Sequence, residues 1–242
     1  MDKYGIIGFP LGHSFSRGFF TEKFAKEGIN AQYLNFEIPN VAMLGEVLSH
    51  NPELRGLNVT LPYKQAVLPM LHELSDEAKE IGAVNVIRVR DGRLKGFNSD
   101  IIGFSESIKP LLQPHHTKAL ILGTGGASRA IRVGLSRLGV EWTYVSRSPQ
   151  EGILTYADLT PEVMAEYTII VNCSPVGMFP NVDHAPDIPY EHLTAKHLLF
   201  DLVYNPEDTR FMKKGREHGA VVKNGLEMLH LQAVAAWGFW NE

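Results

Sequence analysis

One stretch decides the fold: Lys118-Ala-Leu-Ile-Leu-Gly123-Thr-Gly125-Gly126-Ala127-Ser-Arg-Ala130. Residues 118–123 predict a short buried strand, and residues 127–138 predict a helix that ends at Gly139. A phosphate can approach the backbone only where side chains are absent, and the start of a helix offers free N–H groups and a partial positive charge. We therefore expect a dinucleotide to bind at Gly123, Gly125, Gly126 and Ala127. The alternative is a glycine-rich turn without a ligand.

The next expected strand, residues 140–145, leads to the residues that choose the cofactor. In NAD-binding proteins an acidic residue about 20 residues after the first glycine commonly binds the ribose hydroxyls. Here that place holds Ser146-Arg147-Ser148. A guanidinium with two hydroxyls favours a 2′-phosphate over a bare ribose, so the sequence predicts NADP. The alternative is that Arg147 is an ordinary solvated surface residue.

The pattern of short apolar runs and helix-like segments extends along the chain in both directions, which predicts mainly parallel sheets covered by helices. After the glycine loop we expect strands at residues 168–172, 198–203 and 220–222, and a final helix over 226–240. Before it we expect strands at 4–8, 31–38 and 57–61, with helices at 16–26 and 41–49.

Two segments between these elements have expected roles of their own. Asp91-Gly92 separates the apolar runs 84–90 and 93–97 and suits the primed turn of a β-hairpin. The polar, proline-bearing segment 113–117 is the expected linker between two domains.

The composition excludes several classes of protein. The chain has 242 residues with a formal net charge of −4 and no long basic run, so we expect no nucleic-acid partner. Cys173 is the single cysteine, which excludes an internal disulfide framework and a Cys-x-x-Cys metal cluster, and we expect no metal site. The N-terminus does not resemble a signal peptide, and no apolar run approaches the roughly 18 residues of a membrane span. We therefore expect a cytoplasmic protein with no membrane partner.

The first half of the chain carries polar residues at the expected ends of strands, where ligands of open α/β sheets bind. They lie in the segments 8–16, 56–64, 82–85 and 96–103. Each has a structural explanation when taken singly, because serines cap helices, Asn58 and Thr60 can satisfy backbone groups, and Lys64 can be solvated.

Taken together, these segments resemble the shikimate dehydrogenase family. Its patterns occur here in order as His13-Ser14-x-Ser16, Asn58-Val-Thr60-x-Pro-x-Lys64, Gly82-Ala-x-Asn85 and Asn98-Ser99-Asp100-x-x-Gly103. The resemblance continues through the glycine loop to Asn172–Met178, Asp201–Thr209 and Gly225–Ala233, and so covers essentially the whole chain. It departs at Ser99, where threonine is usual, at Arg17, where proline often stands, and at residues 146–148, where Asn-Arg-Thr is frequent.

The resemblance implies an α/β protein of two domains and a reaction, the NADPH-dependent reversible reduction of 3-dehydroshikimate to shikimate in aromatic amino-acid biosynthesis. It implies a mainly parallel substrate-binding domain over residues 1–100, to which the helix 226–242 returns, and a Rossmann-type NADP-binding domain over residues 101–225. The implied catalytic pair is Lys64 and Asp100. The substrate would further contact Ser14, Ser16, Thr60, Asn85, Tyr204 and Gln232. The cofactor would lie on the glycine loop, Ser146, Arg147 and Ser148, with Gly225 and Met228 near the nicotinamide.

Two other functions stay open at this point. One is a quinate/shikimate dehydrogenase that uses NAD, which Arg147 disfavours. The other is a non-catalytic NADP-binding regulator, which would need neither Lys64 nor Asp100. The expected oligomeric state is a monomer or a homodimer.

Overall fold

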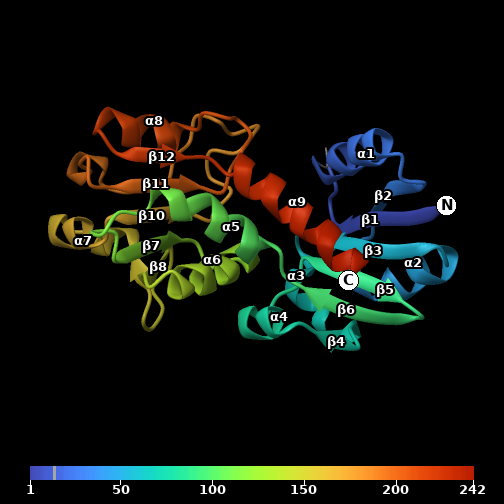
Figure 1. Cartoon of the computed structure of the whole chain (residues 1–242). Coiled ribbons are helices and arrows are strands. Elements are labelled where there is room, and N and C mark those ends of the chain that lie inside the picture. The colour runs from blue at the N-terminus through green and yellow to red at the C-terminus, as the bar shows by residue number, and fades with distance from the viewer. Residues whose placement is uncertain (13–14) are drawn as a thin grey trace. The chain divides into compact units, whose positions relative to one another are not determined.

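The computed structural model describes residues 1–12 and 15–242, and the chain divides into two compact units. The first unit comprises Met1–Ser99 with Gln232–Glu242, and the second comprises Asp100–Leu231 (Figure 1). The resemblance places the divisions after residue 100 and before residue 226, whereas the second division between the units lies inside helix α9 (Leu226–Asn241). No helix within the described ranges is long and apolar enough to span a membrane.

The first unit is built on a six-stranded mixed sheet. The strand order is β2 (Ala31–Glu37), β1 (Asp2–Gly8), β3 (Leu54–Val59), β5 (Val86–Arg90), β6 (Arg93–Phe97) and β4 (Glu73–Leu74) (Figure 1). Strand β1 pairs in parallel with both of its neighbours, while the β3–β5 and β5–β6 pairs are antiparallel.

The turn between β5 and β6 confirms the predicted hairpin. Asp91 and Gly92 have φ angles of 50° and 73°, so both central residues of this two-residue turn are left-handed. This is the backbone that a type I′ turn requires, and aspartate followed by glycine adopts it readily. The turn sets the pairing of Val86 with Phe97, so that Asn85, directly before Val86, and Asn98, directly after Phe97, come together at one end of the hairpin.

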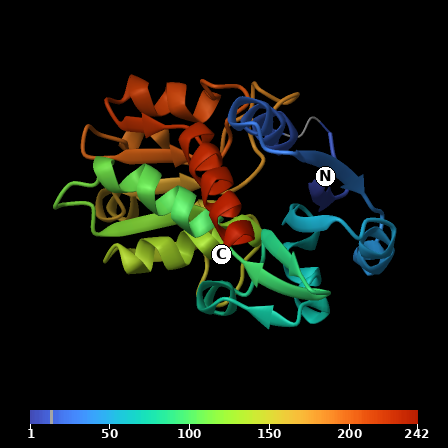
Figure 2. The ribbon, with the colours of Figure 1, turned by 45° about the vertical axis from the view of Figure 1, so that its right-hand side comes forward.

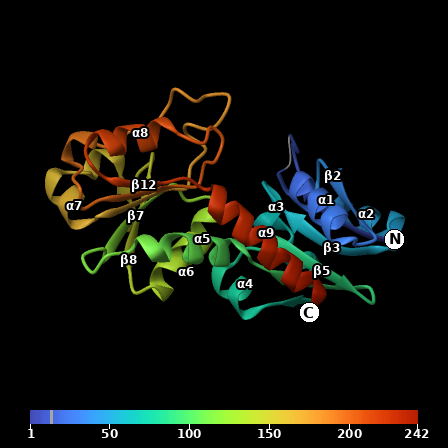
Figure 3. The same cartoon turned by 45° about the horizontal axis from the view of Figure 1, so that its top comes forward.

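Side chains alternate between the two faces of this sheet, and each face has its own apolar core. On one face, Tyr4 and Ile6 pack against α1 (Phe15–Glu27) and the second half of α9 (Figure 3). On the other face, Ile7 packs with residues of α2 (Leu44–His50), α3 (Tyr63–Ala66) and α4 (Asp76–Ile81).

Helix α9 approaches its sheet very closely. A Cβ atom at Gly56 would collide with the Trp240 indole, so this position in β3 must be glycine for the helix to lie where it does. The indole Nε1 donates to the Ile87 carbonyl at 3.1 Å, which satisfies the one polar atom of this buried ring. The C-terminal half of α9 is therefore an integral part of the first unit.

The second unit is a doubly wound α/β fold whose six strands are all parallel. The strand order is β12 (Val221–Lys223), β11 (Leu198–Asp201), β10 (Ile169–Asn172), β7 (Lys118–Leu122), β8 (Glu141–Ser146) and β9 (Leu154–Thr155). Helices α5 (Asp100–Ile108) and α6 (Gly126–Arg137) contribute to the core on one face, and α7 (Pro161–Glu166) and α8 (Arg210–Glu217) to the core on the other (Figure 2). The strand order reverses between β7 and β10, and ligands of such sheets bind beside that reversal at the carboxyl ends of the strands.

The predicted linker at residues 113–117 is wrong. This segment lies inside the second unit and connects α5 and a short 3-10 helix (Lys109–Leu111) to β7. His116 is buried there: its Nδ1 accepts from the Gln113 amide at 2.9 Å, and its Nε2 lies 3.0 Å from the Lys196 carbonyl. The other residues of the segment are exposed, so it is a surface connection within the second unit and not a link between domains.

Candidate active site

The first unit contains a cluster of polar side chains formed by the buried Asn85 and Ser99 and the half-buried Gln232. The Asn85 Nδ2 atom donates to Ser99 Oγ at 3.0 Å and to Gln232 Oε1 at 3.2 Å, and the Ser99 amide donates to Asn85 Oδ1 at 2.7 Å. Asn85 precedes β5, Ser99 follows β6 and Gln232 lies on α9. The structure therefore brings together two of the residues predicted to contact the substrate, Asn85 and Gln232, although they lie far apart in the sequence.

Backbone hydrogen bonds form the turn between Thr60 and Lys64 and join Lys64 to the loop that carries Asn85. Thr60 follows β3, and its carbonyl accepts from the Tyr63 amide at 2.9 Å at the start of α3. The Lys64 carbonyl accepts from the Val84 amide at 2.7 Å, one residue before Asn85. The motif that contains Thr60 and Lys64 thus turns sharply after the strand and places the lysine backbone beside the loop that carries Asn85.

Asp100 is the first residue of α5 and is only 5% exposed. It directly follows Ser99 of the polar cluster but belongs to the second unit, whereas Lys64 belongs to the first. The pairing of the two side chains therefore stays a prediction.

Ser16 lies in the first turn of α1 and is buried, while Ser14 lies outside the described residues. Burial raises the pKa of the Tyr33 phenol, and the Ser16 hydroxyl opposes that rise. The Tyr33 hydroxyl donates to Asn58 Oδ1 at 2.7 Å, and Asn58 Nδ2 donates to the Asn85 carbonyl at 3.4 Å. Asn58 thus satisfies a backbone group, as the sequence suggested, whereas its bond to Tyr33 forms only because β2 and β3 flank β1.

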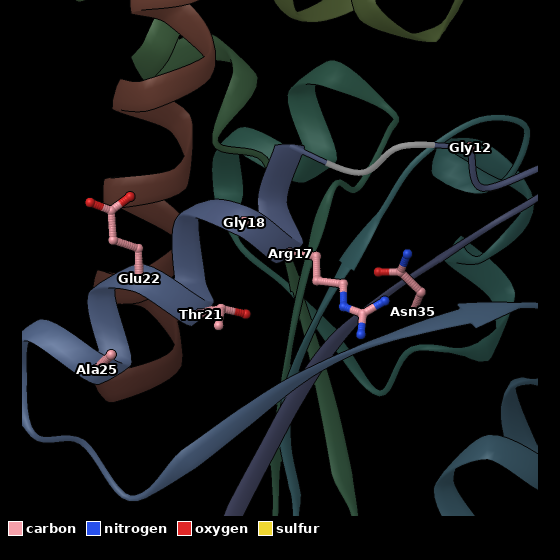
Figure 4. Close-up of a pocket in the computed structure, with 7 residues that line it drawn as sticks. All are labelled: Gly12, Arg17, Gly18, Thr21, Glu22, Ala25 and Asn35. Carbon is pink, nitrogen blue, oxygen red and sulfur yellow. The ribbon is translucent and has the colours of Figure 1, made fainter.

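A groove is lined by residues of α1, beginning at Arg17 directly after Ser16, and by Asn35 of β2 (Figure 4). It has a volume of about 530 Å³. Its lining residues are Gly12, Arg17, Gly18, Thr21, Glu22, Ala25 and Asn35. The lining includes Arg17, at which the chain departs from the family pattern, but none of the predicted substrate residues that the structure describes. The groove is therefore separate from the polar cluster.

The glycine loop of the second unit has the geometry that a phosphate needs. Gly123 directly follows β7 and has a φ of +103°, a left-handed conformation that favours glycine. Gly125 is the N-cap of α6, and its carbonyl accepts from the amide and the hydroxyl of Ser128 at 3.1 and 2.7 Å. The first turn of α6 contains no acidic residue. The helix start therefore presents its amides and its positive end to an anion.

Arg147 follows the end of β8 and is exposed. The turn around it is held by Ser146, whose hydroxyl donates to the Ser148 carbonyl at 2.9 Å and accepts from the Ser148 amide at 3.2 Å. Burial raises the pKa of the neighbouring Tyr156 phenol, and the Arg147 charge opposes that rise. The end of β8 thus offers a cation and two hydroxyls, and no carboxylate at the position where an NAD-binding protein has one.

A buried carboxylate organises the carboxyl ends of β10 and β11. Asp201 is fully buried and accepts from Asn172 Nδ2 at 2.9 Å, from the Val203 amide at 3.0 Å and from Thr209 Oγ1 at 2.7 Å. Desolvation nevertheless raises its pKa to about 6, against the effect of these hydrogen bonds. Desolvation and the nearby Asp201 charge also raise the pKa of the Cys173 thiol well above its usual value, which disfavours the nucleophilic thiolate.

Three predicted ligand contacts follow this carboxylate along the chain. Tyr204 is 36% exposed, three residues beyond Asp201. The Gly225 amide donates to the Val203 carbonyl at 3.2 Å, and a Cβ atom at Gly225 would collide with the Leu202 carbonyl oxygen. Met228 is buried in the core that contains Phe104. Gly225 therefore allows two backbone segments at this edge of the sheet to touch, which no larger residue would permit.

Comparisons with known proteins agree with this arrangement. Residues 6–87 match the model of a family described as the shikimate dehydrogenase substrate binding domain. A shikimate dehydrogenase (NADP(+)) of Desulforamulus reducens is 35% identical over 258 residues, which cover 98% of this chain and 89% of that protein.

The fold is also that of solved structures. A shikimate 5-dehydrogenase of Thermus thermophilus, in complex with NADP(H) and shikimate, superimposes with a TM-score of 0.88 at 33% identity and covers 99% of this chain and 93% of its own. A 5-ketofructose reductase of a Gluconobacter strain gives a TM-score of 0.84 at 28% identity, with 99% and 92% covered.

Proposed function

This chain belongs to the shikimate dehydrogenase family, and we propose that it catalyses the NADP-dependent, reversible reduction of 3-dehydroshikimate to shikimate. This reaction belongs to aromatic amino-acid biosynthesis. The observation that carries the proposal is that, in a chain of this family, Ser146, Arg147 and Ser148 occupy the end of β8, where an NAD-binding protein commonly has an acidic residue. A site of this kind suits an oxidoreductase that uses NADP.

The residues of the second unit fit the cofactor. The amides at the start of α6 and the open backbone at Gly123 and Gly125 would hold the pyrophosphate, and Arg147 with Ser146 and Ser148 would hold the 2′-phosphate. Gly225 and Met228 would lie near the nicotinamide. We therefore assign NADP binding to the second unit.

We assign substrate binding mainly to the first unit. Shikimate carries a carboxylate and ring hydroxyls, and hydroxyl and amide side chains can bind both without a buried cation. Ser14 and Ser16 would bind the carboxylate, and Thr60, Asn85 and Gln232 the ring hydroxyls. Tyr204 would complete the set from the second unit. The direct bond between Asn85 and Gln232 supports this assignment, because each amide fixes the orientation of the other.

The chemical step needs a proton donor. When bound, NADPH supplies a hydride to the carbonyl carbon, and the carbonyl oxygen becomes an oxyanion. The Lys64 ammonium would stabilise this oxyanion and donate the proton, and the same amine would take the proton back in the oxidation of shikimate. Asp100 would favour the charged lysine and orient the hydroxyl next to the reacting carbon.

The test is a comparison of initial rates, followed by absorbance of the reduced nicotinamide, with shikimate or quinate and with NADP or NAD. We expect the highest kcat/KM with shikimate and NADP. A preference for quinate and NAD would support the quinate/shikimate dehydrogenase instead, and NADP binding without turnover would support a regulator.

We further propose that the enzyme is cytoplasmic and acts as a monomer or a homodimer. Light scattering after size-exclusion chromatography distinguishes the two oligomeric states.

A further inference from the structure

The groove beside α1 contains an unpaired polar atom. Its volume of about 530 Å³ is that of a small-molecule site, and it is lined by Gly12, by α1 and by Asn35 of β2 (Figure 4). The Oδ1 atom of Asn35 is buried, yet it accepts no hydrogen bond within the part of the chain that the structure describes. Buried polar atoms are nearly always paired, because an unpaired one costs folding free energy. A ligand that donates a hydrogen bond in the groove would supply the missing partner.

Asn35 lies on the face of β2 that is turned toward α1. Tyr33, two residues earlier and hence on the same face, stacks on Phe20 of α1 with ring centroids 5.0 Å apart. Phe36, on the other face, packs in the core that contains Ile7. An apolar side chain at position 35 would suit the packing against α1, so the packing does not explain the amide.

Gly18 keeps the groove open at a cost to α1. It lies inside this helix, where glycine is less stable than alanine. Its φ angle is not in the left-handed region, and a Cβ atom there would meet no described atom within 4 Å. Neither the backbone nor the packing therefore requires glycine at this position. Because Gly18 lines the groove, a side chain here would take up part of its space.

The polar side chains of the lining indicate what the groove can bind. The Arg17 side chain extends from α1 in the direction of Asn35 (Figure 4). A guanidinium has five N–H donors in a planar fork, so Arg17 can bind a carboxylate while it keeps other contacts. Thr21 adds a hydroxyl to the lining and Glu22 a carboxylate. These groups suit a molecule that combines a carboxylate with a nearby hydrogen-bond donor.

We propose that this groove binds a small carboxylate that carries a hydroxyl or an ammonium group on the carbon next to the carboxylate. The carboxylate binds to Arg17, the donor group binds to Asn35 Oδ1, and the rest of the molecule lies over Gly18. The charge of Glu22 adds to the attraction of an ammonium group. Among the described residues, no predicted contact of shikimate or NADP lines the groove, so this site is additional to the proposed active site and does not depend on the proposed function.

Calorimetric titration with four probes that share one side chain tests the proposal. L-Leucine carries the ammonium group, L-2-hydroxy-4-methylpentanoate carries the hydroxyl, 4-methylpentanoate carries neither, and L-leucinamide lacks the carboxylate. We expect one of the first two probes to bind with a Kd of about 1 mM or lower, and the last two to bind at least about fivefold more weakly, because each lacks one hydrogen-bonding group. The tighter of the first two probes identifies the donor. Binding by neither of them, or an equally low Kd for a probe that lacks one group, would overturn the proposal.

Two substitutions show whether the probe binds in the groove. Asn35→Leu replaces the unpaired amide with an apolar side chain of similar shape, and Gly18→Leu fills the groove. Each should raise the Kd of the tighter probe at least about fivefold. Gly45→Leu is the matched control, because Gly45 also lies in a helix, α2, and a Cβ atom there also meets no described atom within 4 Å, but it does not line the groove. Unchanged binding in both groove variants would place the ligand elsewhere and contradict the proposal.

The melting temperature without ligand separates a binding role of Asn35 from a structural one. Because an unpaired buried acceptor destabilises the fold, Asn35→Leu should melt at or above the wild-type temperature. A clear decrease would show that the amide supports the fold, which would remove the basis of the proposal. Arg17→Met tests the site independently of that result. It should raise the Kd of the tighter probe at least about tenfold, since it removes a charge-assisted hydrogen bond, and an unchanged Kd would also overturn the proposal.

Discussion

The ligand contacts predicted for the two units use different parts of the chain. In the first unit they are side chains such as Asn85 and Gln232, which bond to one another, so that each amide has a fixed orientation. In the second unit the predicted pyrophosphate site is the backbone at Gly123 and Gly125. The polar residues Asn172, Asp201 and Thr209 of this unit are fully buried, and Asn172 and Thr209 both donate to the Asp201 carboxylate.

This difference teaches how to interpret polar motifs. A polar residue near the end of a strand is a predicted ligand contact in the first unit and part of an internal hydrogen-bond network in the second, although the two look alike in the sequence. Burial does not distinguish Asn85 from Asp201, because both are at most 3% exposed. Substitutions in the two units should accordingly fail in different ways.

The largest effect should come from the first unit at Lys64. Lys64→Ala should lower kcat by about 10²–10⁴-fold, the usual worth of a positioned acid or base, with little change in affinity for shikimate. Steady-state kinetics and calorimetry of the same preparation measure both quantities. Near-normal kcat with lost affinity would make Lys64 only a binding residue.

Asp100→Asn should differ from the lysine variant by impairing both turnover and shikimate binding, because Asp100 is expected to contact the substrate as well as the lysine. A variant that loses kcat alone would restrict the carboxylate to an effect on Lys64.

A smaller effect should come from the second unit at Arg147. A charge-assisted hydrogen bond contributes about 1.5–3 kcal/mol, so Arg147→Ala should raise KM for NADP roughly ten- to a hundredfold. KM for NAD, which has no 2′-phosphate, should stay nearly constant. Equal increases for both cofactors would show that the guanidinium does not bind the 2′-phosphate.

The last prediction concerns the stability of the fold and the hydrogen bonds of Asp201. The pKa of Asp201 is raised from 3.8 to about 6 by folding, so this carboxyl favours the folded state at acidic pH and loses that contribution as pH rises through about 6. The full shift corresponds to about 3 kcal/mol. The melting temperature of wild type relative to Asp201→Asn should therefore increase when the pH falls from 7 to 4.5.

Asp158→Asn is the control for this pH dependence. Hydrogen bonds from Thr155 lower the pKa of the exposed Asp158 carboxyl, so its contribution to stability should change with pH in the opposite direction. A pH-independent difference between wild type and Asp201→Asn would mean that Asp201 has the same pKa in the folded and unfolded chain.

The sequence predicted the elements that depend on local chemistry. The Asp91-Gly92 turn, the Gly123 loop and the final helix all follow from conformational preferences or periodicity within a few residues. The segment 113–117 was misassigned because a polar, proline-bearing connection on the surface need not separate two domains, and this one lies inside the second unit. The bond between Tyr33 and Asn58 could not be predicted, because it forms only when β2 and β3 flank β1, which no local pattern specifies.

The central claim is that substrate is bound mainly by side chains of the first unit and that the second unit determines the choice of cofactor. The most direct test is kcat/KM, with shikimate and NADP each varied, for Ser16→Ala, Arg147→Ala and the double variant. Ser16→Ala should weaken only shikimate, Arg147→Ala only NADP, and the free-energy losses should add in the double variant. A single variant that weakens both ligands equally, or losses that do not add, would contradict this division.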